Sequence, residues 1–195
     1  MSSVSKNNSR DFAAGVRLRA YTPADFERLY VIDQSCYEPR IAYSRTELRQ
    51  YLRFPGADCV VAETMQKHSA EAMPQNAAED DARHNAASAM IGFCITAHKT
   101  SWGYIITMDV LSSYRRHGVG SMLLIEAERR LIASGVRQIG LETATNNSPA
   151  IAFWQKHGYR KSGIRKNYYP GGRDAYSMAK RLAGVQSVAK AGSQH

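Results

Sequence analysis

The 195-residue chain lacks any uninterrupted apolar run of about 18 residues, the length at which a membrane-crossing helix is suspected. Its first residues, MSSVSKNNSRDF, contain no apolar core of the kind that a secretory signal requires. The sequence therefore predicts neither a membrane span nor secretion. We expect a cytoplasmic protein without a membrane partner.

Cysteine is also scarce. Cys36, Cys59 and Cys94 are widely spaced and contain no CxxC pair. This usage is typical of reduced thiols in or near a core, and it argues against a disulfide framework or a zinc site. None of the three lies in a recognisable setting for a nucleophile. No metal site is predicted.

Acidic residues are the minority charge. Lysine and arginine number 26 against 17 aspartates and glutamates, which gives a formal net charge of +9. The excess suggests an anionic partner such as a phosphorylated cofactor, a nucleic acid or a ribosomal surface, although a solvated basic face would give the same count. Zinc-finger spacing, an RNP-like aromatic strand and long lysine/arginine blocks are missing. Direct nucleic-acid binding is therefore not expected.

Three polar segments stand apart from the rest of the sequence. Residues 1–14 and 183–195 are predicted to be disordered tails. Residues 65–87 are rich in alanine, glutamine, asparagine and acidic side chains, with almost no bulky apolar residue, so we expect a flexible insertion there. What remains, residues 15–182, suits a single domain with a sizeable core.

Within that domain, hydrophobic patterns of strand and helix type alternate. Thr22 and Pro23 mark the start of a helix, and Gly135 marks the end of another. Strands are expected over 16–22, 58–64, 88–99, 103–111, 137–144, 159–169 and 174–182, and helices over 22–37, 44–53, 119–134 and 148–158. A meander followed by strands alternating with two helices predicts an α/β (α+β) fold, with a mixed sheet of about seven strands and helices on both faces.

The segment SSYRRHGVGS joins the strand ending near Val110 to the helix starting near Gly118. A strand that enters a helix through a glycine-bearing turn has the outline of a phosphate cradle, because free N–H groups and the positive helix end face the anion. The lysine of a Walker loop and the third glycine of a dinucleotide fingerprint are missing. What remains is R-x-x-G-x-G, formed by Arg115, Arg116, His117, Gly118, Val119 and Gly120.

This loop resembles the acetyl-CoA loop of the GNAT superfamily of N-acetyltransferases, in which a [QR]-x-x-G-x-[GA] segment wraps the cofactor pyrophosphate. Further on, LETATNNSPAIAFWQKHGYRKSGIRKNYYP is similar to the second signature of the superfamily, N-x-x-A-[IL]-x-x-[YW]-x-x-x-G-[FY]. Its places are filled by Asn147, Ala150, Ile151, Gly158 and Tyr159. The resemblance covers roughly residues 16–182. It implies the GNAT fold, with acetyl-CoA as cosubstrate.

The resemblance also implies which residues contact the cofactor. The loop would wrap the pyrophosphate, with Arg116 at a position that the motif leaves free. A splayed strand before the loop would expose a backbone N–H to the acetyl carbonyl and pair with the pantetheine arm, which assigns these roles to Met108, Asp109 and Val110. Asn147 would reach the pantetheine or phosphate arm, cap the helix that follows it, or do both.

Within the superfamily, the tail GIRKNYYPGGRDAYSMAKRL is similar to protein N-terminal acetyltransferases, in particular the ribosomal-protein alanine (RimI) type. In these relatives a tyrosine loop closes over the substrate N-terminus, and Tyr168 and Tyr169 occupy that place. Aromatic packing at a hairpin end is the alternative interpretation. The resemblance implies acetylation of the α-amine of a peptide or protein N-terminus, with a ribosomal protein as one candidate acceptor.

The chemistry favours an α-amine. With a pKa of about 7.7–8.0, roughly a tenth of the α-amine is neutral at pH 7, whereas a lysine amine with a pKa of about 10.4 is almost wholly protonated. Such a substrate needs only modest help from a general base. Glu142 interrupts the apolar strand IGLETA at the position that the resemblance gives to the base. A structural glutamate paired with an arginine is the alternative.

The chain departs from the RimI type at one position. Where those enzymes usually carry the tyrosine that protonates the leaving thiolate, this chain has Trp154. Its indole N–H is a donor but not a usable acid. Either the thiolate leaves with the help of solvent or another donor, or Tyr168 or Tyr169 replaces the acid. Trp154 is counted with the cofactor contacts. Two other functions stay open. One is a small-molecule amine acetyltransferase, which a wide acidic pocket would favour, and the other is a non-catalytic acetyl-CoA-binding module.

Overall fold

The computed structural model describes residues 15–65 and 89–182. The two expected tails, and all of the expected insertion except Met65, lie outside these residues. The strands are β1 (Val16–Ala20), β2 (Ala57–Thr64), β3 (Ala89–Lys99), β4 (Trp102–Val110), β5 (Gln138–Ala144), β6 (Arg160–Tyr169) and β7 (Arg173–Arg181). The helices are α2 (Phe26–Cys36), α3 (Arg45–Leu52), α4 (Val119–Ala133) and α5 (Ser148–Lys156), with short 3-10 turns η1 (Pro23–Asp25) and η3 (Ser112–Tyr114).

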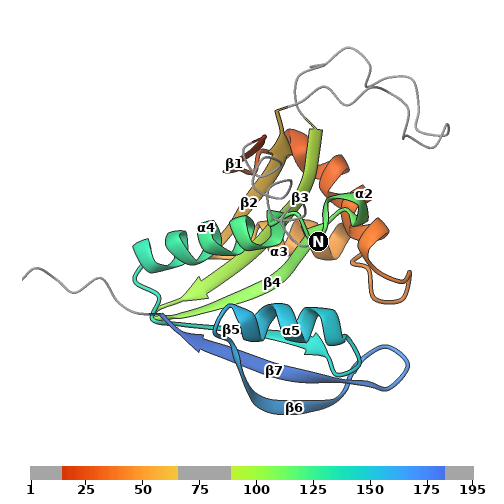
Figure 1. Ribbon diagram of the computed structural model, residues 1–195, viewed down its shortest axis with the longest axis vertical. Helices are drawn as coiled ribbons and strands as arrows, with labels where there is room; N and C mark the ends of the chain where they lie inside the picture. The colour runs from red at the N-terminus through yellow and green to blue at the C-terminus, as the bar shows by residue number, and fades with distance from the viewer. Residues whose placement is uncertain (1–14, 66–88, 183–195) are drawn as a thin grey trace, which may run out of the picture.

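The seven strands form one mixed sheet in the order β1-β2-β3-β4-β5-β7-β6. Only β4 and β5 run parallel, and every other neighbouring pair is antiparallel. Helices α4 and α5 cover one face, and α2 and α3 cover the other (Figure 1). The predicted fold class, a mixed sheet of about seven strands with helices on both faces, is confirmed.

Both faces of β2 and β3 are buried, and their successive side chains point to opposite sides of the sheet. On β2, Val60 and Ala62 pack with α4, whereas Cys59 and Val61 pack with α2 and α3.

All three cysteines are free thiols, two of them buried, and burial raises the pKa of the Cys94 thiol. None of the described helices is both long and apolar enough to cross a membrane.

The predicted helix boundaries hold with one local difference. Gly135 has φ +84° and ends α4 in the left-handed conformation that favours glycine. The helix expected from Pro23 does begin there, but its first turn is 3-10 and the α-helix starts only at Phe26. The Asp25 carboxylate accepts the N–H of Thr22 at 2.7 Å and its hydroxyl at 3.0 Å. Such tight turns are frequent at helix starts.

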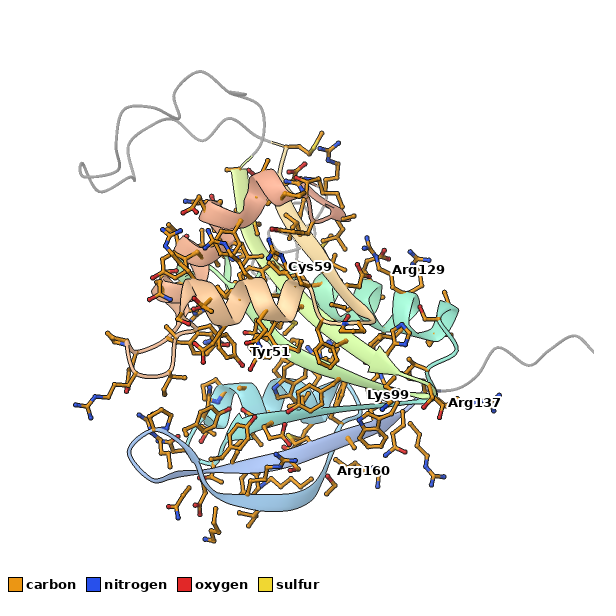
Figure 2. The ribbon with its side chains drawn as sticks, turned by 180° about the vertical axis from the view of Figure 1, so that it is seen from behind. Tyr51, Cys59, Lys99, Arg129, Arg137 and Arg160 are labelled. Carbon is orange, nitrogen blue, oxygen red and sulfur yellow. The ribbon has the colours of Figure 1, made fainter. Side chains whose placement is uncertain are left out.

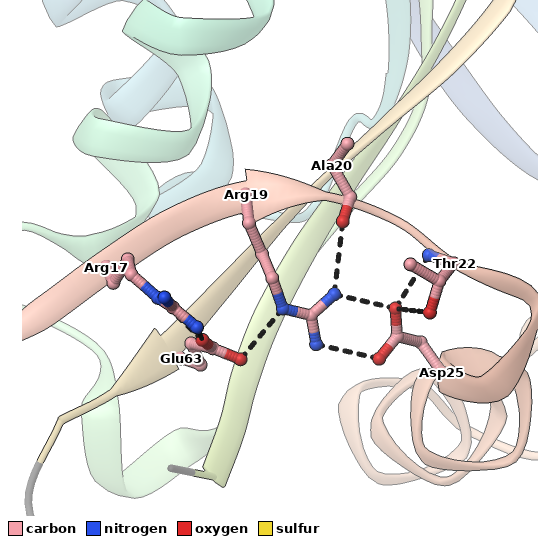
Figure 3. Close-up of polar contacts among 6 residues, drawn as sticks. All are labelled: Arg17, Arg19, Ala20, Thr22, Asp25 and Glu63. Carbon is pink, nitrogen blue, oxygen red and sulfur yellow. Dashed lines mark hydrogen bonds and ion pairs between the residues drawn. The ribbon is translucent and has the colours of Figure 1, made fainter.

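The edge strand β1 is fastened by a network of charges (Figure 3). Arg19 bridges two carboxylates: its Nε lies 2.9 Å from Glu63, and its two terminal nitrogens each lie 2.7 Å from Asp25. Arg17 binds the other oxygen of Glu63. Burial alone would raise the pKa of Glu63, yet the two arginines hold it below its ordinary value. The network therefore joins β1 to β2 and to the start of α2.

Two further carboxylates are buried between α2 and β4. Asp33 is fully buried and Asp109 is 2% exposed. The Thr107 hydroxyl donates to Asp109 at 3.1 Å, and the Tyr37 hydroxyl lies 3.2 Å from that of Thr107. Burial raises the pKa of Asp33 to about 6 and that of Asp109 to about 7. These groups therefore lower stability when they ionise.

We expect Arg19→Met to lower the free energy of unfolding by about 2 kcal/mol, because it leaves the buried Glu63 with one arginine and Asp25 with none. Urea denaturation at pH 7 measures the change. Arg45→Met is the matched control, since Arg45 pairs with Glu27 on the open surface and such pairs contribute little. An equal loss in both variants would contradict a structural role for the network.

We expect Asp109→Asn to become more stable relative to the parent as the pH rises from 5 to 8. The folded-state pKa of Asp109 lies above the ordinary carboxyl value of 3.8, so the folded chain keeps a proton that the unfolded chain has released. Stability from this group is therefore lost as the pH rises through about 7. Urea denaturation across this range tests the slope. The control Asp174→Asn changes a carboxylate whose pKa is lowered by its hydrogen bond with Lys166, so it should show no gain, and a flat difference for Asp109→Asn would refute the assignment.

Candidate active site

The sheet splits between its two central strands. β4 and β5 pair only at Trp102–Gln138, Gly103–Ile139 and Tyr104–Gly140. Beyond these pairs the strands diverge, while β3 follows β4 to Val110 and β7 follows β5 to Ala144 (Figure 1). Within the described chain, no strand covers the two facing edges of the split. The splayed strand that the sequence resemblance requires before the loop is therefore present.

A β-bulge in β4 stands at the start of the split. Ile95 pairs with Thr107 and Thr96 with Ile105, which leaves Ile106 as the extra residue. A bulge bends its strand and changes which face later side chains occupy. Ile106 accordingly packs on the α2 side, and its carbonyl accepts the Tyr43 hydroxyl at 3.5 Å. After the bulge Asp109 faces α2, whereas Met108 and Val110 face α4.

The loop after β4 has the features of an anion site. Arg116 and Gly118 have positive φ angles, +65° and +89°, and Gly118 caps α4 without a side-chain hydrogen bond. The first turn of α4 contains no acidic residue, so its N–H groups and the helix dipole favour an anion. A Cβ atom at Gly118 would meet nothing within 4 Å, so the backbone there is open to a ligand. These features fit the pyrophosphate of a cofactor.

Some side chains of this loop fix it to the domain, and others are exposed to solvent. Arg115 donates its Nε to the Val110 carbonyl at 2.8 Å, which ties the loop to the end of β4. Arg116 is exposed, His117 is half-buried and Val119 is buried in the core. A Cβ atom at Gly120 would touch the Phe153 ring at 3.5 Å, so the loop packs closely against α5 there. Contacts of these residues with a cofactor stay predictions.

Glu142 lies on the part of β5 that has left β4. Its side chain is only 6% exposed, and its Oε1 lies 3.1 Å from the Arg165 Nε and accepts the Ser177 hydroxyl at 3.2 Å. Its Oε2 is buried and has no hydrogen-bond partner among the described residues. The arginine pairing that the sequence left as an alternative is present. The second oxygen nonetheless accepts no hydrogen bond from the described residues, which leaves it able to take a proton as a base does.

Glu142 borders a pocket of about 310 Å³. The other lining residues come from four elements and the segments beside them: Tyr43, Tyr51, Phe54, Ala97, Tyr104, Ile106, Tyr168 and Tyr169. Tyr51 projects from α3 toward the strands (Figure 2). Burial raises the pKa of Tyr169 to about 12, and it also raises the pKa of Tyr51 and of Tyr168. These hydroxyls therefore stay protonated at neutral pH.

The last two predicted residues lie at the two ends of α5, Asn147 at its N-cap and Trp154 in its last turn. The Asn147 side-chain oxygen accepts the N–H of Ala150 at 3.1 Å, so the capping role is confirmed. Trp154 is 8% exposed and packs edge-on against Phe153 and Tyr159 in the core. Neither residue lines the pocket of Glu142. Their contacts with a cofactor stay predictions.

Most residues of this pocket were not predicted from the sequence. Tyr43 and Tyr51 come from distant segments, and Tyr104 and Ile106 belong to the strand before the loop. The signal that could have identified the strand pair is their period-two spacing, which places them on one face. Arg165 could not be found in this way, because it reaches Glu142 across β7.

Comparison with known proteins agrees with this architecture. A model of the acetyltransferase (GNAT) family matches residues 26–159. An N-alpha-acetyltransferase of Saccharolobus solfataricus is 38% identical over 82 residues, which cover 41% of this chain and 48% of the relative. The [ribosomal protein bS18]-alanine N-acetyltransferase of Escherichia coli (strain K12) is 34% identical over 93 residues, 46% of this chain and 63% of the relative. The chain thus spans about half the length of the curated relatives it matches.

Solved structures show the same fold. The ribosomal-protein-S18-alanine N-acetyltransferase from Escherichia coli superposes with a TM-score of 0.67 at 23% identity, covering 88% of this chain and 97% of that one. Ard1 from Thermoplasma volcanium gives 0.68 at 22% identity, covering 87% and 99%. The family model spans most of the described domain, including the split strands, the glycine loop and Glu142. The chain therefore belongs to the acetyltransferase (GNAT) family.

Proposed function

We propose that this chain is an acetyl-CoA-dependent N-acetyltransferase that acetylates the N-terminal α-amine of a protein by direct transfer. The observation that carries the proposal is the unpartnered oxygen of Glu142 in an aromatic pocket beside the split sheet. The names of the relatives support the acceptor class, and one of them makes a ribosomal protein a candidate acceptor. Three free thiols fit a cytoplasmic location.

The residues present fit acetyl-CoA, which would supply the acetyl group. The segment from Arg115 to Gly120 would hold the pyrophosphate on the open N-terminus of α4. The free edge of β4 at Met108, Asp109 and Val110 would pair with the pantetheine arm as an added strand does. A backbone N–H of the same edge would polarise the thioester carbonyl.

Glu142 would act on the amine. Its Oε2 would take the proton that the α-ammonium loses, while the neutral nitrogen attacks the thioester carbon. The C–N bond forms, the C–S bond breaks, and the departing thiolate takes the second proton that the nitrogen loses, so that CoA leaves as the thiol. Arg165 and Ser177 hold Oε1 and so orient the free oxygen. Tyr168 and Tyr169 would grip the substrate, and the modest basicity of a thiolate, with a thiol pKa of about 8.5, makes a dedicated acid dispensable.

Neither alternative function gains support from the pocket. A small-molecule acetyltransferase was expected to show a wide acidic acceptor site. Among the described residues that line this pocket, Glu142 is the only one with a carboxylate, and six of the nine are aromatic. A non-catalytic module would have no need for a buried carboxylate oxygen without a partner, because such an oxygen lowers stability.

We expect Gly118→Asp to weaken acetyl-CoA binding by at least tenfold, because the new carboxylate would repel the pyrophosphate from the α4 N-terminus. Isothermal titration measures the affinity. Gly135→Asp is the matched control: Gly135 also has a positive φ and open space around its Cβ position, but it lies at the other end of α4. Unchanged affinity in a folded Gly118→Asp variant, or equal losses in both, would contradict the loop assignment.

The acceptor is tested with two peptides that match except at the N-terminus and at one internal position: one has a free N-terminus and no lysine, and the other is N-terminally blocked and has an internal lysine. We expect release of CoA thiol to be far faster with the free α-amine. Glu142→Gln should lower this rate by about 10²–10⁴-fold and leave acetyl-CoA affinity intact. The control Glu126→Gln, on α4 and outside the residues that line the pocket, should keep the parent rate. Equal rates on both peptides would refute α-amine specificity.

A further inference from the structure

We infer that the pocket beside Glu142 selects acceptors whose first residue has a large apolar side chain, such as methionine, leucine or phenylalanine, over alanine or serine. The inference rests on the proposed function and names the acceptor class of that same site. It is carried by the chemistry of the lining, the size of the pocket and the contacts that hold its walls.

The lining is apolar away from the base. The rings of Tyr43, Tyr51 and Phe54 form one wall, the hairpin pair Tyr168 and Tyr169 forms the other, and the floor is made by Ala97, Tyr104 and Ile106. Once an α-amine lies at the Glu142 Oε2, the side chain of the same residue has to lie among these groups. Aromatic and aliphatic surfaces stabilise an apolar side chain by burial and dispersion.

The pocket is also larger than a small first residue needs. Its volume is about 310 Å³. An alanine methyl group would leave much of this space without contacts, and every missing contact reduces the dispersion energy gained on binding. A long apolar side chain would fill the space, and each methylene in such a pocket changes kcat/KM by about 10–200-fold.

Each wall is fixed by contacts of its own. The Tyr43 N–H donates to the buried Asp33 at 2.9 Å, and the Tyr43 ring packs edge-on against Tyr51 with centroids 5.0 Å apart. On the opposite wall Tyr168 and Tyr169 pack at 88°, also 5.0 Å apart. Walls fixed in this way do not close around a methyl group. The size of the pocket therefore discriminates between first residues with large and small side chains.

Charge excludes acidic first residues. An acidic side chain would have to lose its water beside the Glu142 carboxylate, and this is unfavourable without a partner. The Arg165 guanidinium is already paired with Glu142, its Nε lying 3.1 Å from the Glu142 Oε1. A peptide whose first residue is aspartate or glutamate is therefore expected to be a poor acceptor.

The experiment uses the full chain, saturating acetyl-CoA and peptides that differ only in the first residue: alanine, serine, glutamate, leucine, methionine or phenylalanine. Thiol release gives kcat/KM for each. We expect the three large apolar residues to exceed alanine and serine by at least tenfold, with glutamate lowest. Alanine or serine peptides that react as fast as leucine and methionine, or a glutamate peptide that reacts fastest, would overturn the inference and leave the proposed function standing.

Two variants place the preference in this pocket. Ala97→Leu fills the floor and should lower the methionine-to-alanine ratio of kcat/KM by at least tenfold. Phe54→Ala removes a ring that is 54% exposed at the rim, so it should fold and should lower the same ratio several-fold. Ile125→Ala, at an exposed site on α4, is the control and should keep the parent ratio. If Ala97→Leu fails to fold, Phe54→Ala decides, and an unchanged ratio in it overturns the inference.

The failure of the proposed function would look different. In that case acetyl-CoA would bind, yet no peptide with a free α-amine would release thiol, whatever its first residue. A preference for alanine with full activity would refute only the selection by the pocket.

Discussion

The loss of pairing between β4 and β5 is the constraint on which the rest of the site depends. Three residue pairs join the strands, and beyond Tyr104–Gly140 each strand keeps only its outer neighbour. Backbone N–H and C=O groups that leave water must find partners, so an edge opened inside a sheet favours an extended ligand. The glycine loop follows one side of this opening, and Glu142 lies on the other. Cofactor and acceptor would meet where the pairing ends.

The bulge at Ile106 gives β4 two roles beside this opening, one in the acceptor pocket and one in the burial of Asp109. The inserted residue places both Ile106 and Thr107 toward α2. Ile106 contributes to the floor of the pocket, whereas Thr107 donates its hydroxyl to the buried Asp109. The base is built from the other half-sheet, where three adjacent strands contribute Glu142, Ser177 and Arg165. The site is therefore a product of strand order more than of any single motif.

Much of the fold could be predicted, because its signals are local. Pro23 and Gly135 act within one turn of the helices that they bound, and the buried strands β2 and β3 are largely apolar in sequence. The loop and Glu142 follow from motifs with fixed spacing. The bulge could not be predicted, since neither glycine nor proline marks Ile106. The Arg165 contact requires β7 to lie between β5 and β6, an order that no local pattern specifies.

Asp33 shows how stability and site geometry are linked. Its carboxylate is fully buried, one oxygen has no partner in the described chain, and burial raises its pKa to about 6. An apolar residue would fit such a place better on stability grounds alone. The other oxygen, however, accepts the Tyr43 N–H and the Gln34 amide, and so fixes the segment between α2 and α3. A buried acid that disfavours folding thereby sets the position of the ring that forms a wall of the acceptor pocket, and local inconsistencies of this kind are expected at functional sites.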